Sequence, residues 1–318
     1  MPVPAAVFRL ASNTLSAMRV AVVIPCFNDG RFLPDALASL ADQEPHELVI
    51  VDDGSEDAET LALLDSLRAA GTTVVSQANA GLGPARMAGV AATTAPYVHP
   101  LDADDRLAPG ALRTLADALD ASPKAAAAWG DYRTFGVSNC RFPTAPRLDP
   151  WRITFLDEIP GTTMVRREAI EAVGGWDAVG YEDWDFWMRL AEHGFDGVGV
   201  GELTLLYREH ETPRLLADTV AEHDRRFGTL RTRHARLFAS RRRNWSRSQT
   251  PLMLKLALPL IDAVPGLSEA RKRKLWGMAR YFFQREMCSE CYRSPFARLR
   301  ELVLRRDAPE PPIDALDA

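Results

Sequence analysis

The chain has 318 residues, of which 47% are hydrophobic and 25% are charged, and its formal net charge is -5. This composition is that of a globular protein and excludes a disordered chain, and the negative net charge gives no reason to expect a nucleic-acid partner. The longest apolar stretch, residues 252–264, is too short to span a membrane and contains three interrupting residues, Lys255, Pro259 and Asp262.

The first 130 residues alternate between short apolar runs, typical of buried strands, and segments with helical periodicity. The strand-like runs are 20–24, 48–51, 72–75, 97–101 and 125–129, and the helical segments are 32–40, 61–67, 84–92 and 112–119. Further along the chain, residues 132–160 are irregular, helices are predicted at 168–173 and from Asp183, and a strand at 203–207. Repeated units of this size predict an α/β fold with a mostly parallel, Rossmann-like sheet flanked by helices.

Ligands of such sheets bind beyond the carboxyl ends of the strands, so the residues that follow each strand are the candidates for a site. Two of these ends carry clustered carboxylates, at Asp52-Asp53 and at Asp102-Ala103-Asp104-Asp105. Clustered carboxylates repel one another unless a cation or hydrogen-bond donors lie beside them. No glycine-rich phosphate-binding loop follows the first strand, so a nucleotide is expected to be held through carboxylates and a metal.

Taken in order, these motifs resemble family 2 glycosyltransferases over residues 19–210. The resemblance rests on the ordered strings Val22–Asn28, Val51–Ser55, Asn79–Leu82, Ala85-Arg86, Leu101–Asp105, Gly174–Asp177, Glu182–Asp185 and Tyr207–His210. It implies a GT-A-type fold and inverting, metal-assisted transfer of a sugar from a nucleoside diphosphate sugar. The chain departs from the family pattern at Phe27, where tyrosine is common, and at Met87, where asparagine is common.

The resemblance assigns Asp102 and Asp104 to a D-x-D motif that binds Mg²⁺ or Mn²⁺. In an extended segment, residues i and i+2 project to the same side, so both carboxylates can face one hard cation. Asp53, together with Asp52, matches the pair that binds the base, and a carboxylate that accepts from the N3–H of uracil favours UDP. The remaining residues assigned to the donor site are Pro25, Phe27, Asn28 and Arg86, with Asp102 also contacting the ribose.

Asp183 matches the general base, which takes the proton from the acceptor hydroxyl. Its predicted place in the first turn of a helix favours the ionised carboxylate. From the residues alone, helix capping is the favoured role of Glu182 and Asp183, and the resemblance reverses that preference. His210 matches a histidine that some family members use as a further metal ligand, and it is also compatible with an ordinary surface histidine.

The charge is distributed unevenly along the chain. Residues 225–306 contain 21 Lys and Arg against five Asp and Glu. We therefore divide the chain into an N-terminal extension (1–18), a GT-A catalytic domain (19–224) and a basic helical region (225–318). Basic clusters beside amphipathic segments are typical of contact with an anionic membrane, although a packed appendage with solvated arginines is the alternative. No nucleic-acid motif accompanies the charge.

The sequence thus predicts a hexosyltransferase-type enzyme in the cytoplasm, at the inner face of the membrane where the basic region makes contact. It would transfer a sugar, from a UDP-linked donor, to a glycan, lipid-linked or other hydroxyl acceptor in polysaccharide or glycoconjugate synthesis. Two alternatives are a sugar nucleotidyltransferase and a non-catalytic sugar-nucleotide-binding or scaffold protein.

Overall fold

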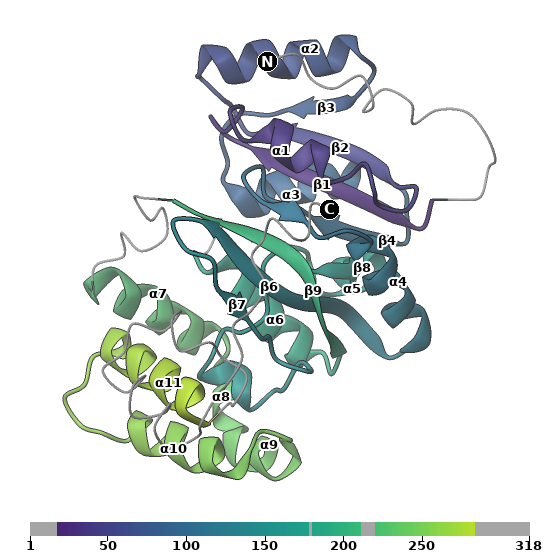
Figure 1. Ribbon diagram of the computed structural model, residues 1–318. Coiled ribbons are helices and arrows are strands. Elements are labelled where there is room, and N and C mark those ends of the chain that lie inside the picture. The colour runs from purple at the N-terminus through teal and green to yellow at the C-terminus, as the bar shows by residue number, and fades with distance from the viewer. Residues whose placement is uncertain (1–17, 178–179, 211–219, 284–318) are drawn as a thin grey trace. The chain divides into compact units, whose positions relative to one another are not determined.

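The computed structural model describes residues 18–177, 180–210 and 220–283, which form two compact units (Figure 1). The first unit holds residues 18–132, 144–148 and 159–207, and the second holds residues 133–143, 149–158 and the described residues from Arg208 onward. The domain boundary predicted at 224/225 stays a prediction. The contacts divide the chain after Tyr207, and they place two short segments from the irregular stretch in the second unit.

The first half of the first unit follows the predicted alternation of strands and helices. Its elements are β1 (Val20–Cys26), α1 (Leu33–Ala38), β2 (Glu47–Asp52), α2 (Ala58–Ala69), β3 (Thr73–Ser76), α3 (Leu82–Ala91) and β4 (Tyr97–Pro100). Every residue of β1 is buried, because helices cover both faces of a parallel sheet. A strand covered on both faces needs apolar side chains at every position, which explains the uninterrupted apolar run that predicted this strand.

The second half of the first unit completes a mixed sheet. It contains β5 (Arg106–Leu107), α4 (Ala111–Ala121), β6 (Ala125–Gly136), β8 (Met164–Arg166), α5 (Arg167–Val173), α6 (Glu182–Glu192) and β9 (Asp196–Glu209), with β6 and β9 running on into the second unit. The strand order is β3-β2-β1-β4-β8-β6-β9-β5. The strands β3, β2, β1 and β4 pair in parallel, whereas β8 pairs antiparallel with both β4 and β6. The parallel part of the expected sheet is therefore its first four strands.

The core of the first unit lies between β1 and the helices beside it. The apolar stripe of α4 is fully buried, with Leu112, Leu115, Ala116 and Leu119 at 0% exposure. Such an apolar stripe, repeated at helical spacing, can bury itself only against a neighbouring layer. It packs in one cluster with Val20, Val22 and Ile24 of β1.

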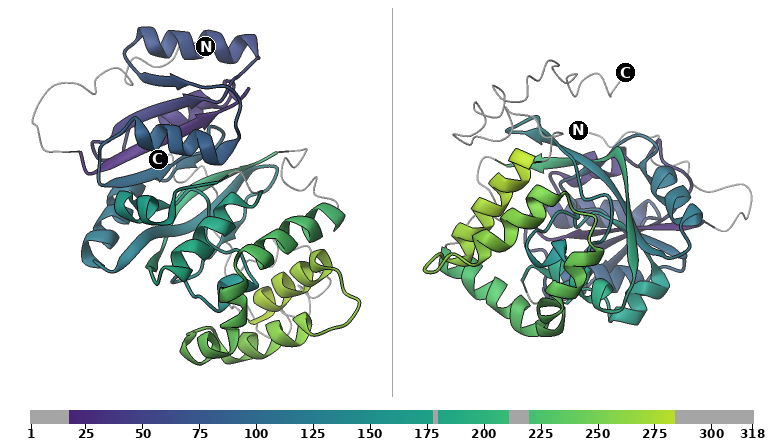
Figure 2. Two further views of the ribbon diagram at one scale, coloured as in Figure 1. Left: turned by 180° about the vertical axis from the view of Figure 1, so that it is seen from behind. Right: turned by 90° about the horizontal axis from the view of Figure 1, so that it is seen from below.

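The second unit consists mainly of helices. They are α7 (Val220–Arg233), α8 (Ala235–Ala239), α9 (Arg241–Arg247), α10 (Leu252–Asp262) and α11 (Glu269–Phe283) (Figure 2). The unit also contains the short strand β7 (Arg141–Phe142), which pairs with β6, and a 3-10 turn at Arg152–Thr154. Among the described residues, no helix has both the length and the apolar character needed to cross a membrane.

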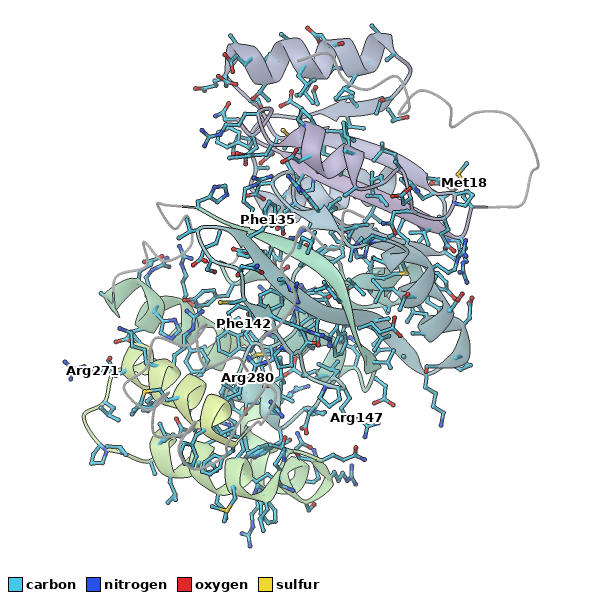
Figure 3. All side chains as sticks on the ribbon, viewed as in Figure 1. Met18, Phe135, Phe142, Arg147, Arg271 and Arg280 are labelled. Atoms are coloured by element: carbon cyan, nitrogen blue, oxygen red, sulfur yellow. The ribbon has the colours of Figure 1, made fainter. Side chains whose placement is uncertain are left out.

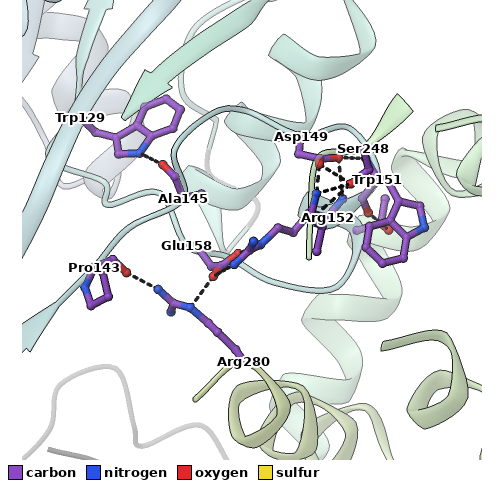
Figure 4. Close-up of polar contacts among 11 residues, drawn as sticks. Trp129, Pro143, Ala145, Asp149, Trp151, Arg152, Glu158, Ser248 and Arg280 are labelled. Atoms are coloured by element: carbon purple, nitrogen blue, oxygen red, sulfur yellow. Dashed lines mark hydrogen bonds and ion pairs between the residues drawn. The ribbon is translucent and has the colours of Figure 1, made fainter. Parts of the chain in front are cut away.

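Arginines of the second unit occupy two kinds of position. Arg271, near the start of α11, points away from the helices (Figure 3). Arg280, on the same helix, points inward and pairs with Glu158, which also pairs with Arg152 (Figure 4). Glu158 is 2% exposed, so its charge is buried and matched by two guanidinium groups.

Candidate donor and acceptor-activation site

The carboxyl ends of β2, β1 and β4 meet at one edge of the first unit's sheet. The register pairs Cys26 with Asp52, and Leu101 N–H donates to the carbonyl of Val23. The three segments that the sequence selected therefore follow adjacent parallel strands. This is the edge at which α/β sheets bind ligands.

Asp53 holds the segment that leads into α3. Its buried carboxylate accepts hydrogen bonds from Gln77 Nε2 (2.7 Å), Ala80 N (2.9 Å) and Gly81 N (2.9 Å). Only one of these three bonds reaches Oδ2, so this oxygen can still accept from a ligand. Asp53 therefore positions the start of α3 whatever else it binds.

Asp52 and Asn28 fix the turns around Asp53. The carboxylate of Asp52 accepts from Ser55 N (2.9 Å) and from the hydroxyl of Ser76 (3.2 Å). Asn28 lies in the left-handed region (φ 55°), and its side-chain oxygen accepts from the N–H groups of Glu56 and Asp57. Asparagine tolerates this backbone conformation better than most residues. Both side chains hold loops through these hydrogen bonds. The sequence analysis assigned them to the donor site and did not predict this structural role.

Pro25 and Phe27 differ in their access to solvent. Pro25 is buried within β1, so any contribution to a base pocket comes through the backbone shape it fixes. Phe27 follows the strand and is 44% exposed. An exposed phenylalanine ring at a ligand-binding edge offers an apolar face to a ligand.

Arg86 of α3 connects two of the predicted site residues. Its guanidinium is 1% exposed and pairs with Asp183 and, at 3.0 Å, with Asp102. The two carboxylates are 25% and 31% exposed, so they remain open to solvent on the side away from Arg86. Burial alone would lower the pKa of Arg86, but the charges of Asp183, Asp102 and Glu182 outweigh it and raise that pKa. Arg86 is thus a permanent cation that holds the two carboxylates in place.

Asp183 lies in the first turn of α6, as predicted. The helix begins after Tyr181, which adopts the left-handed conformation (φ 65°). Burial raises the pKa of Asp183 to about 6, with Arg86 opposing and the charges of Glu182 and Asp102 adding to the rise. A carboxylate whose pKa approaches neutrality is better suited to accept a proton than an ordinary aspartate.

Gly161 is a residue of this site that the sequence analysis missed. A Cβ at this position would overlap Asp183 Oδ2 and would lie 3.2 Å from Arg86 Nη2. Only a residue without a side chain allows the backbone to pass so close to the carboxylate. No motif marked it, because the segment just before it is irregular.

Asp102 and Asp104 follow β4 and are both half-buried. Within the described ranges, no three His, Cys, Asp or Glu side chains come together to form a complete metal site. Among the same residues, Asp102 Oδ2 has no hydrogen-bond partner, since Arg86 pairs with Oδ1. A carboxylate with an open oxygen, with a second carboxylate two residues along the chain, fits a hard cation whose other ligands are phosphate oxygens and water.

Tyr207 was part of the matched strings but received no role. Burial raises the pKa of its hydroxyl, and the charges of Asp105, Asp102 and Asp104 raise it further. The hydroxyl therefore stays protonated and faces an acidic cluster. His210, the third predicted metal ligand, belongs to the second unit, and its metal role stays a prediction.

Comparison with protein families gives a match to Glycosyl transferase family 2 over residues 21–174. An uncharacterized glycosyltransferase of Nostoc sp. is 36% identical over 109 residues, which cover 33% of this chain and 34% of that protein. One from Mycobacterium tuberculosis is 36% identical over 102 residues, covering 32% of this chain and 44% of that protein. The aligned part is thus less than half of these relatives' length.

Solved structures share the fold over more of the chain. Staphylococcus aureus TarS (residues 1–349), solved with UDP-GlcNAc, has a TM-score of 0.56 at 18% identity, covering 83% of this chain and 88% of that chain. The mannosyltransferase PcManGT of Pyrobaculum calidifontis, solved with GDP-Man and Mn²⁺, has a TM-score of 0.50 at 18% identity, covering 90% and 79%. The predicted α/β, GT-A-type fold is confirmed, and residues 21–174, just under half of the chain, match glycosyltransferase family 2.

Proposed function

We propose that the protein is an inverting glycosyltransferase that moves a sugar from a nucleoside diphosphate sugar, UDP-linked, to an acceptor hydroxyl. The observation that carries this proposal is the buried Arg86, which ties Asp183 to Asp102 at the ligand-binding edge of the sheet. The family match over residues 21–174 and the sugar nucleotides bound by TarS and PcManGT support it. The acceptor would be a glycan, a lipid-linked sugar or another hydroxyl compound.

The donor would lie along the strand ends. Asp53 Oδ2 accepts one hydrogen bond and can accept a second from the N3–H of a uracil ring, and the exposed Phe27 would offer an apolar surface to the base. Asp102 and Asp104 would hold a Mg²⁺ or Mn²⁺ ion, which supplies positive charge for the leaving diphosphate. The Mn²⁺ in the PcManGT structure supports this choice of cation.

Asp183 would act on the acceptor. Its carboxylate would take the proton of the attacking hydroxyl as the new bond forms at the anomeric carbon and the bond to the diphosphate breaks. Arg86 keeps that carboxylate oriented, and the exposed part of Asp183 is where the hydroxyl would approach. No covalent enzyme intermediate is needed, so the configuration at the anomeric carbon would invert.

Calorimetric titration of UDP, GDP and dTDP, first with Mn²⁺ and then with EDTA, tests the donor site. We expect UDP binding that depends on the metal and is lost in Asp104→Ala. Binding of no nucleotide in either buffer would contradict the proposal. Binding that never leads to sugar transfer, with any acceptor class, would favour the non-catalytic alternative.

A further inference from the structure

Helix α10 of the second unit exposes an apolar face. Four of its side chains are about half to two-thirds exposed, namely Leu252 (63%), Met253 (55%), Leu256 (48%) and Leu260 (69%). At 100° per residue, these four fall within an arc of about 100°, opposite the fully buried Leu254 and Leu258. Soluble proteins rarely leave such a contiguous apolar surface in water unless something binds there.

Helix α9 places a tryptophan and a cation beside this face. Lys255 of α10 donates to the carbonyl of Ser248 (2.9 Å) and lies over the ring of Trp245 (4.4 Å), and these contacts join the two helices. Arg242 is exposed and has no hydrogen-bond or ion-pair partner within the part of the chain that the structure describes. Trp245 is itself 38% exposed, and a tryptophan with one apolar and one polar edge suits a boundary between water and lipid.

A pocket of about 320 Å³ lies at the junction of the two helices. Its walls are Trp151, Phe155, Arg241, Arg242, Trp245, Pro259, Asp262 and Ala263. The guanidinium of Arg241 already has partners, since it donates to Thr154 and pairs with Asp262. Pro259 lies about 20° around α10 from Leu252, so the pocket directly borders the apolar face. Arg242 is therefore an unpaired cation at the edge of an apolar surface.

We propose that this surface, formed by the exposed face of α10 with Trp245 and Arg242, docks on an anionic lipid bilayer. The acyl chains of a bilayer can bury the exposed leucines of α10, and anionic headgroups can pair with Arg242. Residues 220–283 carry 15 Lys and Arg against four Asp and Glu, so a second copy would bring like charge to the same surface. The proposal requires no sugar transfer and stands apart from the proposed function.

Co-sedimentation of the full chain with vesicles tests the proposal. We expect binding to phosphatidylcholine vesicles that contain phosphatidylglycerol, and little binding to phosphatidylcholine alone. Leu256→Ser with Leu260→Ser should weaken the partition coefficient roughly tenfold, because two leucines no longer enter the bilayer. Arg242→Glu should weaken it by a similar factor, and this part of the binding should be lost at high salt.

Matched variants in the first unit serve as controls. Leu61→Ser on α2 and Arg113→Glu on α4 change an exposed leucine and an exposed arginine, and both should leave vesicle binding unchanged. Circular dichroism and thermal unfolding check that all variants fold. Binding that is absent, or equal in the α10 variants and the controls, would overturn the proposal. So would a concentration-dependent dimer that the α10 variants abolish, since the face would then bind a second copy.

Discussion

Two carboxylates, one in each unit, lie beside arginines, and their pKa values shift in opposite directions. Asp183 shares the single guanidinium of Arg86 with Asp102, and its pKa is raised to about 6, chiefly by burial. Burial also acts to raise the pKa of Glu158, but the charges of Arg280 and Arg152 outweigh it and lower that pKa. Asp183 is 25% exposed and Glu158 only 2%.

Burial acts to raise both pKa values, so the opposite directions of the two shifts come from the ratio of cations to carboxylates around each group. One cation shared among several carboxylates leaves a proton-accepting group at a solvent-accessible place, which suits chemistry. Two cations around one carboxylate give a closed, satisfied ion cluster, which suits structure. An arginine–carboxylate pair therefore indicates function only when its charges are unequally matched and open to a ligand.

Asp183→Asn should produce the largest effect on activity. An amide cannot take the acceptor proton, so the transfer rate should fall roughly thousandfold while nucleotide binding persists. Removing one of several like charges should leave the thermal midpoint equal or higher. Single-turnover transfer, calorimetric nucleotide titration and thermal unfolding measure the three quantities. A variant that retained most of its rate would remove Asp183 from the role of base.

Glu158→Gln should have the opposite profile. The change leaves two buried guanidinium groups without a counter-charge, so the free energy of unfolding should fall by about 3 kcal/mol. The rate per folded molecule should stay unchanged. Urea unfolding measures the loss, and Glu171→Gln on the exposed side of α5 is the control, expected within about 0.5 kcal/mol of the parent. Equal stability of the two variants would mean that the ion cluster contributes nothing.

Gly161→Ala tests the packing against Asp183. The new methyl group must displace the carboxylate or the backbone, so kcat should fall roughly tenfold with a smaller change in donor affinity. The matched control is Gly228→Ala in α7, where an added Cβ meets nothing within 4 Å. That control should keep its activity. An unchanged rate in Gly161→Ala would show that Asp183 tolerates displacement.

The smallest expected effects are the pH dependences of the transfer rate and of the free energy of unfolding, which should distinguish Asp183 from Glu158. The rate should fall about tenfold per pH unit below about 6, because Asp183 must be ionised to accept a proton. Since its pKa is raised on folding, the folded protein binds this proton more tightly than the unfolded chain. Its contribution to the free energy of unfolding therefore decreases as the pH rises from the ordinary carboxyl range to about 6, and is constant above.

Glu158 has the opposite sign. Its pKa is lowered on folding, so its contribution is present above the ordinary glutamate pKa and is lost as the pH falls through the folded value. Urea unfolding of the parent, Asp183→Asn and Glu158→Gln across pH 3–7 isolates each contribution by difference. A difference between parent and Asp183→Asn that did not vary between pH 4 and 6 would contradict the raised pKa.

The sequence predicted what depends on local pattern. The buried run at Val20–Ile24 and the aspartates after β2 and β4 stand out because strands of a covered parallel sheet are apolar and end abruptly. The first turn of α6 was likewise placed from helical spacing. These features need only neighbouring residues to define them.

What the sequence missed depends on residues far apart in the chain. Arg280 and Glu158 belong to unrelated segments, and no periodicity relates them. Gly161 matters because of one close approach to Asp183, which no motif records. The antiparallel pairing of β8 with β4 and β6 was also missed, because repeated strand and helix signals do not reveal strand direction.

The position of Arg86 between Asp102 and Asp183 has a consequence for the order of events in a catalytic cycle. A cation bound at Asp102 competes for that carboxylate, which leaves more of the arginine's field on Asp183 and lowers its proton affinity. Thermodynamic linkage makes this relation mutual, so loss of the proton strengthens donor binding. In the proposed enzyme, one guanidinium would thereby couple binding of the cation and its donor to the ionisation of Asp183, and the apparent donor affinity should rise with pH across the titration of Asp183.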